Sequence, residues 1–141
     1  MVTRTGSARW NGDLAHGSGT MRTQSGALEG AYTFASRLES GKGTNPEELI
    51  AAAHAGCYSM ALSNDLANAG HVPTFVDTTA KVTLDKVEGG FAITGIALEC
   101  TATVPGLDNA TFQKFAEGAK VGCPVSKALA GTTISLSAKL V

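Results

Sequence analysis

The chain has 141 residues, which is the size of one domain, and only 16% of them are charged, against about 25% in an average globular protein. Because few charges are available to cover the surface, we expect part of it to be buried by association between chains. The net charge of −1 excludes a basic surface for nucleic acid or for an anionic membrane.

The chain carries no recognisable targeting or membrane signal. Its first ten residues lack an apolar core and a small-residue cleavage site, and the uncharged stretch Ile50–Asn64 is only fifteen residues long, too short to span a bilayer. Three cysteines is an odd number without a secretory signal, which argues against a disulfide framework. We therefore expect a soluble, cytoplasmic protein with free or reactive thiols.

The N-terminal part, about 1–44, has the pattern of β structure. Asn11-Gly12 is a strong hairpin signal because both residues tolerate positive φ. Further turns are expected near Gly17-Ser18-Gly19 and Ser25-Gly26, with a weakly alternating strand between them. Ala31–Leu38 is compatible with either a strand or an ordered loop.

A long central helix is predicted over about 46–69. Asn45 is a good N-cap, Pro46 suits the first helical position, and Gly70 suits the position after the last turn. The middle of this helix has no charged face and contains many alanines, and a helix that is apolar all round is buried all round. We expect a sheet on one side of it and a second subunit on the other.

The C-terminal part, about 74–141, begins with a predicted hairpin. Residues 76–84 alternate between apolar and polar, Glu88-Gly89-Gly90 forms the turn, and Phe91–Val104 is the returning strand. A helix capped by Asp108 or Asn109 follows, with Phe112, Phe115, Ala116 and Ala119 on one face. After a break at Gly122-Cys123-Pro124, a short helix runs to Leu129, and Thr132–Val141 is a closing strand.

Two cysteines are the leading chemical candidates. Cys57 lies in the middle of the central helix with His54 one turn before it, and Cys123 stands at an N-cap, where free N–H groups favour a thiolate. About 65 residues separate them, so they form neither a Cys-x-x-Cys loop nor a zinc knuckle, and only folding could bring them together as a peroxidatic and a resolving thiol. The alternatives are a small core residue for Cys57 and a tolerated cap residue for Cys123.

Other polar residues carry weaker signals. Cys100 lies on the apolar face of a predicted strand and is expected in the core. Arg37 is flanked by apolar residues, so it either points into a site or is a solvated loop charge. His54 with Cys57 would supply only two metal ligands, and no further cluster completes a metal site. No glycine-rich dinucleotide motif is present, and no cofactor is expected.

Several motifs resemble the osmotically inducible protein C (OsmC) family. They are the run from Asn45-Pro46-Glu47-Glu48 to Cys57, the Gly122-Cys123-Pro124-Val125 motif, and the shorter segments Trp10–Asp13, Thr79–Asp85, Phe91–Thr94 and Val104–Gly106. The resemblance covers essentially the whole chain. It implies one α+β domain over 1–141, with an antiparallel sheet wrapped around a long central buried helix, in an intertwined homodimer whose two active sites lie at the subunit interface.

The resemblance also implies roles for particular residues. Cys57 would be the peroxidatic cysteine, Cys123 the resolving one, and Arg37 with Glu47 the pair that orients and activates the Cys57 thiolate. An external dithiol, such as a lipoylated protein, would reopen the disulfide. His54 replaces the tyrosine of the related organic hydroperoxide resistance (Ohr) branch, which favours the OsmC branch.

The helix adds a geometric constraint. Ten residues separate Glu47 from Cys57, which is about 15 Å along a helix axis. Their side chains could not meet within one subunit, so a site that uses both requires Glu47 from the partner chain.

The leading functional hypothesis is a thiol peroxidase for organic hydroperoxides, and secondarily hydrogen peroxide, in oxidative and osmotic stress defence. The expected substrate surface comprises His54, Tyr58, Met60, Phe34 and Leu38. One alternative is a non-catalytic dimeric module that binds a small hydrophobic ligand and in which the thiols are incidental. Another is a cysteine hydrolase using Cys57 and His54, although no orienting carboxylate is apparent.

Overall fold

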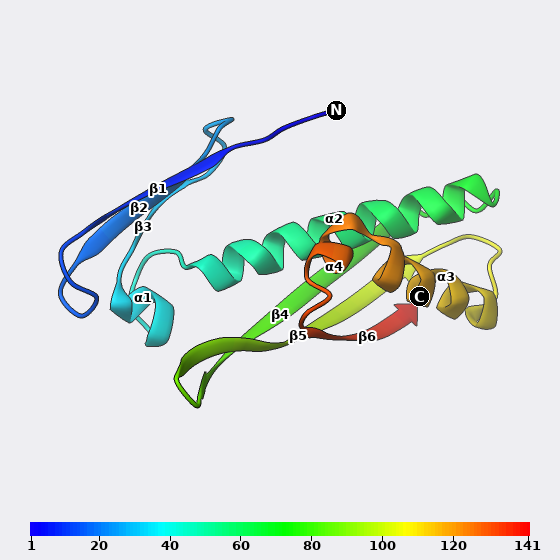
Figure 1. The fold of residues 1–141 in the computed structure, drawn as a ribbon. Coiled ribbons are helices and arrows are strands. Elements are labelled where there is room, and N and C mark those ends of the chain that lie inside the picture. Colours follow the sequence, from blue (N-terminus) through cyan, green and yellow to red (C-terminus); the bar gives the residue numbers. More distant parts are fainter. The chain divides into compact units, whose positions relative to one another are not determined.

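A computed structural model describes all residues from 1 to 141. The chain divides into two compact units, 1–49 and 50–141, and each is described by itself (Figure 1). None of the helices combines the length and the apolar character needed to cross a membrane. The elements together belong to the α+β class, as predicted.

The N-terminal unit is built on a three-stranded antiparallel sheet in chain order. Its strands are β1 (Gly6–Asn11), β2 (Ser18–Thr23) and β3 (Glu29–Tyr32). The predicted turns at Gly12 and Gly26 are confirmed, since both glycines have positive φ, 89° and 73°. The turn expected near Gly17-Ser18-Gly19 is wrong for its last two residues, which lie in β2 and pair with β1.

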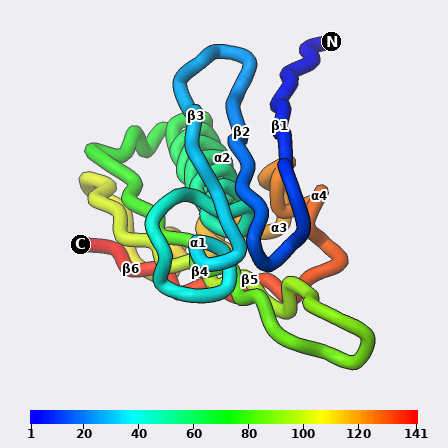
Figure 2. The backbone as a smooth tube through the Cα atoms, turned by 90° about the vertical axis from the view of Figure 1, so that its left-hand side faces the viewer, coloured from blue at the N-terminus to red at the C-terminus, as the bar shows by residue number.

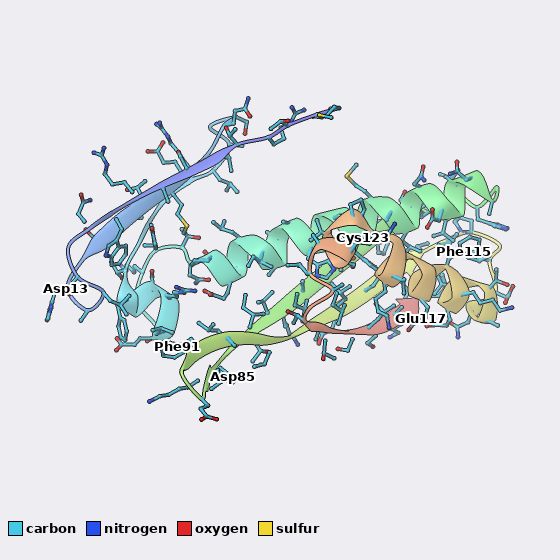
Figure 3. The ribbon with its side chains drawn as sticks, viewed as in Figure 1. Asp13, Asp85, Phe91, Phe115, Glu117 and Cys123 are labelled. Carbon is cyan, nitrogen blue, oxygen red and sulfur yellow. The ribbon has the colours of Figure 1, made fainter.

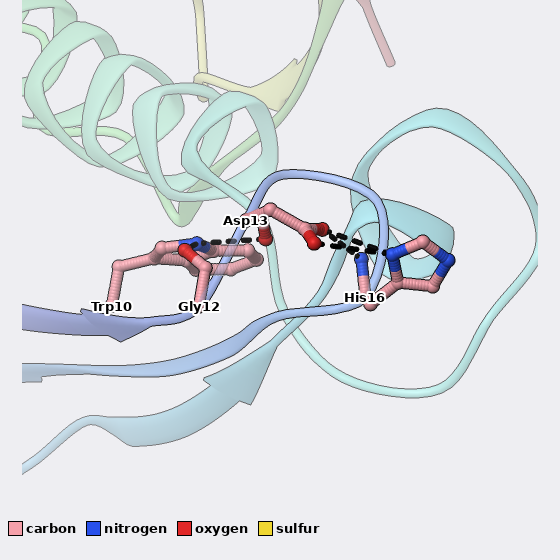
Figure 4. A network of polar contacts seen from close by, with 4 residues as sticks. All are labelled: Trp10, Gly12, Asp13 and His16. Carbon is pink, nitrogen blue, oxygen red and sulfur yellow. Dashed lines mark hydrogen bonds and ion pairs between the residues drawn. The ribbon is translucent and has the colours of Figure 1, made fainter.

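The connection between β1 and β2 is held by its own side chains and backbone (Figure 4). The Trp10 indole N–H donates to the carbonyl oxygens of Gly12 and Asp13, at 3.1 and 3.2 Å. The Asp13 carboxylate accepts the His16 N–H at 2.7 Å and pairs with the His16 imidazole. The His16 side chain is exposed.

Helix α1 (Phe34–Leu38) follows β3 directly. Thr33 begins it with a capping box, in which its hydroxyl accepts the Ser36 N–H and the Ser36 hydroxyl accepts the Thr33 N–H. Both expectations for this stretch, a strand or an ordered loop, are therefore wrong after residue 33. Five residues are too few to display a helical period.

Helix α2 (Pro46–Asn68) matches the predicted central helix to within a residue at its end. The Asn45 carboxamide oxygen accepts the Glu48 N–H at 2.8 Å, which is the predicted N-cap. Gly70 has φ of 87°, and the His71 N–H donates to the Leu66 carbonyl at 2.8 Å, which ends the helix as glycine after the last turn commonly does.

The second unit contains a three-stranded sheet in the order β4 (Phe75–Val87), β5 (Gly90–Thr103) and β6 (Thr133–Leu140). β4 and β5 form the predicted antiparallel hairpin, whose tip extends past β6 (Figure 2). β6 runs parallel to β5, so the expectation of an antiparallel sheet is wrong for this pair. The helices α3 (Asn109–Gly122) and α4 (Pro124–Ala128) form the crossover that a parallel pair requires.

The core of this unit lies between the sheet and the helices. Its buried side chains come from α2, from β5 and the residue after it, and from α3. They are Tyr58, Leu62, Leu66, Ile96, Leu98, Cys100, Ala102, Val104, Phe112, Ala116 and Ala119. The core position of Cys100 is confirmed. The opposite face of α2, with Ala52, Ala53, Gly56 and Met60, is exposed in the chain. Burial against the sheet is thus confirmed for one face only, and the covering second subunit stays a prediction.

Candidate active site

Two free thiols from distant parts of the sequence meet in the second unit. Cys57 is in α2, and Cys123 is at the junction of α3 and α4, where Figure 3 labels it. The two thiols lie close enough for each to shift the pKa of the other. Cys123 is fully buried, whereas Cys57 keeps part of its surface exposed. The fold therefore brings the two cysteines close together, as a peroxidatic and a resolving thiol require.

Cys123 is the N-cap of α4. Its Sγ accepts the Ser126 N–H at 3.3 Å, and Pro124 stands at the first helical position. Burial acts to raise the pKa of the Cys123 thiol, but hydrogen bonds from the Ser126 hydroxyl and N–H, from Cys57 and from the Val125 N–H outweigh it. The pKa of Cys123 is therefore lowered, and the surroundings favour its thiolate.

The pKa of Cys57 moves in the opposite direction. Burial raises it, the Val125 N–H partly offsets that effect, and the neighbouring Cys123 raises it further. Two neighbouring thiols cannot both ionise easily, and within the second unit the opposite shifts of their pKa values favour the thiolate on Cys123 over that on Cys57. None of the groups that shift the Cys57 pKa is a cation.

His54 is fully buried next to the cap of α4. Its Nε2 lies 2.7 Å from the Ser126 hydroxyl oxygen, and its Nδ1 is buried without a hydrogen-bond partner. Burial lowers the pKa of His54 and keeps the imidazole neutral. Because the imidazole bonds to Ser126, the Cys57–His54 pair that a cysteine hydrolase needs is not formed.

Tyr58 is also enclosed in the core. Its hydroxyl donates to the Ala116 carbonyl at 3.2 Å, and burial raises its pKa. Neither His54 nor Tyr58 presents surface to a substrate in this unit, which argues against the substrate contacts expected of them. Met60, in contrast, is 76% exposed.

Arg37 and Glu47 meet in the N-terminal unit. Arg37 Nη2 donates to Glu47 Oε1 at 2.7 Å, and Arg37 Nε donates to Oε1 and Oε2 at 3.1 and 3.3 Å. The Glu47 side chain is nearly buried and the Arg37 side chain is about half-exposed. Of the alternative reading as a solvated loop charge, the loop is wrong, because Arg37 lies in α1, and the ion pair holds the partly exposed guanidinium in one orientation.

Local sequence explains why these two side chains meet. The Asn45 amide donates to the Ser36 carbonyl at 3.1 Å while its oxygen caps α2, and the Ser36 hydroxyl donates to the Thr44 carbonyl at 2.8 Å. These bonds tie α1 to the first turn of α2. Phe34 and Leu38, the remaining expected substrate residues, are half-buried on α1.

Comparison with known proteins identifies the family to which this chain belongs. The model of the OsmC-like protein family matches residues 39–137. The chain belongs to the OsmC-like family. Peroxiredoxin OsmC of Escherichia coli strain K12 is 55% identical over 129 residues, which cover 91% of this chain and 90% of that one.

Two further OsmC-like relatives carry a different name. The organic hydroperoxide resistance protein of Xanthomonas axonopodis pv. citri is 37% identical over 92 residues, 64% of this chain and 63% of that one. The crystal structure of an organic hydroperoxide resistance protein from Elizabethkingia anophelis superposes with a TM-score of 0.73 at 26% identity and covers 99% of both chains.

Two residues of this OsmC-like site were missed from the sequence. Ser126 donates its N–H to Cys123 and contacts His54, and the Val125 N–H acts on both thiols. The signal available for Ser126 was its place three residues after a capping cysteine, where the N–H of a first turn is free. No group of three or more His, Cys, Asp or Glu side chains converges to hold a metal ion.

Proposed function

We propose that the protein is a thiol peroxidase that reduces organic hydroperoxides, with Cys57 as the peroxidatic and Cys123 as the resolving cysteine. The observation that carries the proposal is the close approach of these two thiols, since a sulfenic acid on one could condense with the other. The names of the relatives, peroxiredoxin and organic hydroperoxide resistance protein, support the same chemistry.

The first step is attack of the Cys57 thiolate on the distal oxygen of the hydroperoxide. An S–O bond forms as the O–O bond breaks, leaving a Cys57 sulfenic acid and an alkoxide that takes a proton to become the alcohol. The exposure of the two sulfurs favours this order, because Cys57 is partly exposed and Cys123 is fully buried.

The second step is attack of Cys123 on the Cys57 sulfur. The S–S bond forms, the S–O bond breaks, and the departing hydroxide takes a proton to become water. An external dithiol, such as a lipoylated protein, then supplies two electrons and two protons to restore both thiols. Three free cysteines suit a reducing compartment, and we propose the cytoplasm.

The attacking charge must lie on Cys57, although the second unit by itself favours a thiolate on Cys123. A cation beside Cys57 would reverse this preference. We assign that role to Arg37 of a second subunit, oriented by its own Glu47. The ten-residue spacing of Glu47 and Cys57 along the single helix α2 supports this assignment, because it corresponds to about 15 Å along the axis.

Two surfaces support an intertwined homodimer. The apolar α2 face with Ala52, Ala53, Gly56 and Met60 is exposed in the chain. The N-terminal unit buries no large apolar side chain of its own, and its sheet borders an open apolar hollow of about 400 Å³ lined in part by Met21, Leu28 and Leu49. A three-stranded sheet needs an apolar face covered to be stable, and a second copy would supply the cover.

The proposed substrate surface combines the exposed Met60 with Phe34 and Leu38 of the partner chain's α1. These apolar side chains favour hydroperoxides with a hydrocarbon group over hydrogen peroxide. The preference belongs to the proposed dimer and depends on its assembly.

The test is single-turnover reduction of cumene hydroperoxide by reduced wild type, Cys57→Ser and Cys123→Ser. We expect no reduction by Cys57→Ser, and one equivalent of alcohol from Cys123→Ser with a sulfenic acid left on Cys57. Cys100→Ala, which removes a third thiol that does not contact the pair, is the matched control and retains the wild-type rate. Peroxide reduction by Cys57→Ser at the wild-type rate would refute the proposal.

A further inference from the structure

A chain of polar contacts connects Cys123 to a buried histidine that takes no part in the proposed steps. Ser126 donates its N–H to Cys123 Sγ at 3.3 Å, and its hydroxyl oxygen lies 2.7 Å from His54 Nε2. The same hydroxyl acts on Cys123 and lowers the pKa of its thiol. The three side chains are each almost or completely buried. His54 and Ser126 are 72 residues apart, so the tertiary fold makes this contact.

The unpartnered nitrogen of His54 fixes the direction of these hydrogen bonds. Nδ1 is buried and has no partner, and a buried N–H without an acceptor is rarer than a bare acceptor. We therefore place the hydrogen on Nε2, which donates to the Ser126 oxygen. The single hydroxyl hydrogen of Ser126 is then free to donate to the Cys123 sulfur.

We propose that Ser126 and His54 are positioning residues for Cys123, which hold its sulfur against Cys57 and stabilise its thiolate for disulfide formation. This inference rests on the proposed peroxidase function and deepens it. Two donors from one residue, an N–H and an O–H, converge on the sulfur, and hydrogen bonds to a charged acceptor are the strong ones. His54 prevents the hydroxyl from turning away.

His54 acts here as a neutral donor and exchanges no proton. A second proton on Nδ1 would create a buried charge whose N–H has no acceptor, and burial already lowers the pKa of His54. In the step itself, the Cys123 thiolate attacks the Cys57 sulfenic sulfur, and the leaving hydroxide takes its proton from water. The titratable side chains that act on Cys123 or its cap are Cys57, His54 and Tyr58, all on α2.

Disulfide closure can be measured without peroxide. A nitrobenzoate disulfide reagent converts the partly exposed Cys57 to a mixed disulfide and releases one equivalent of the coloured aryl thiol. Attack by Cys123 then forms the Cys57–Cys123 bond and releases the second equivalent. The rate at which the second equivalent is released is followed across pH for the full-length wild type and for Ser126→Ala, Ser126→Thr, His54→Phe and His54→Gln.

We expect Ser126→Ala to slow release about threefold to tenfold at pH 7 and to move the pH midpoint upward. Without this hydrogen bond a smaller fraction of Cys123 is thiolate at pH 7, which slows the attack. Each thiolate that does form is more basic and therefore a better nucleophile, which offsets part of the loss in rate. Ser126→Thr retains the hydroxyl and is expected to keep the wild-type rate of release and the wild-type pH midpoint. His54→Phe shifts the midpoint in the same direction, and His54→Gln, whose amide can donate to Ser126, restores it in part.

Release by Ser126→Ala at the wild-type rate and midpoint would overturn the inference. So would a slower release with an unchanged midpoint, because a purely structural role changes the rate without changing the titration. Thermal unfolding shows which variants are folded, and if His54→Phe is not, the Ser126→Ala and Ser126→Thr pair decides. Failure of the peroxidase proposal is distinguishable, since wild type would then close the disulfide with this reagent but not with cumene hydroperoxide.

Discussion

Arg37 donates two hydrogen bonds to one oxygen of the Glu47 carboxylate, from Nη2 at 2.7 Å and from Nε at 3.1 Å. The pair is anchored from both ends, because the Thr33–Ser36 box begins α1 and Asn45 begins α2. A guanidinium has five N–H groups in one plane, so these two hydrogen bonds leave other donors facing away from Glu47. Such an arrangement suits a cation that must be presented to another group in a fixed direction.

Substitution of either residue of the Arg37–Glu47 pair is expected to slow sulfenic acid formation on Cys57. Arg37→Lys keeps the charge but loses the planar two-point contact, and Glu47→Gln removes the charge that orients it. We expect each to lower the rate constant for cumene hydroperoxide about 100-fold, the lower end of what loss of one aligned electrostatic contact commonly costs. Stopped-flow measurement of the first step gives the value. Arg4→Lys, at an exposed arginine that contacts only a neighbouring carbonyl, is the control and retains the wild-type rate.

Mixing an inactive variant with a slowed one tests whether the site is shared between subunits. Cys57→Ser keeps Arg37 and Glu47, and Glu47→Gln keeps Cys57. After subunit exchange, half of the dimers contain both chains and one complete site each, so we expect about a quarter of the wild-type sites to be active. Activity no greater than the sum of the separate variants, in a mixture whose exchange is verified by mass, would show that each site belongs to one chain.

The exposed small residues of α2 lead to a prediction about assembly. A Cβ at Gly56 meets nothing within 4 Å in the chain, and the same is true of Gly118 on α3. If a partner covers the α2 face, Gly56→Glu buries a charge in the interface and yields monomers, whereas the matched Gly118→Glu remains dimeric. Light scattering after size exclusion distinguishes the two. An unchanged dimer for Gly56→Glu would place the interface elsewhere.

Asp108 gives a prediction for the pH dependence of stability. Its carboxylate accepts the Thr111 N–H at 2.9 Å and the Thr111 hydroxyl at 2.7 Å, and these bonds lower its pKa. A lowered pKa means that the cap stabilises the fold above the ordinary aspartate pKa and loses this effect as the pH falls through the lower pKa of the folded protein. We expect the Tm of Asp108→Ala to lie below that of wild type at pH 7, and the difference to shrink in acid.

Asp108→Asn is the matched variant for this helix start. Asparagine caps a helix about as well as aspartate but has no proton to gain in this range. Its Tm at pH 7 should therefore stay near that of wild type. A Tm difference between wild type and Asp108→Ala that stays constant from neutral pH to acid would contradict the assigned role of the carboxylate.

Local signals predicted the parts of the fold that local interactions determine. Asn45 and Gly70 bracket α2 because an N-cap acceptor and a positive-φ residue act within one turn of the chain. Alternation located β4 and β5, since one face of each meets the core. The direction of β6 is set by the crossover through α3 and α4, and alternation carries no information about direction.

The site was predicted in part. The cap context of Cys123 and the family resemblance identified both thiols and the Arg37–Glu47 pair, and the structure brings each pair together. The contact of His54 with Ser126 has no local signal, because it depends on how α4 packs against α2. The uncharged middle of α2 indicated burial on all sides, yet hydropathy does not tell a chain's own sheet from a neighbouring molecule.

The mass of the intact protein after one equivalent of cumene hydroperoxide tests the central claim most directly. Reduced wild type is predicted to lose two hydrogen atoms, and peptide mapping to show a Cys57–Cys123 disulfide with Cys100 still free. An unchanged mass would contradict the account and favour a binding module whose thiols are incidental, and a disulfide that includes Cys100 would contradict the assigned pair.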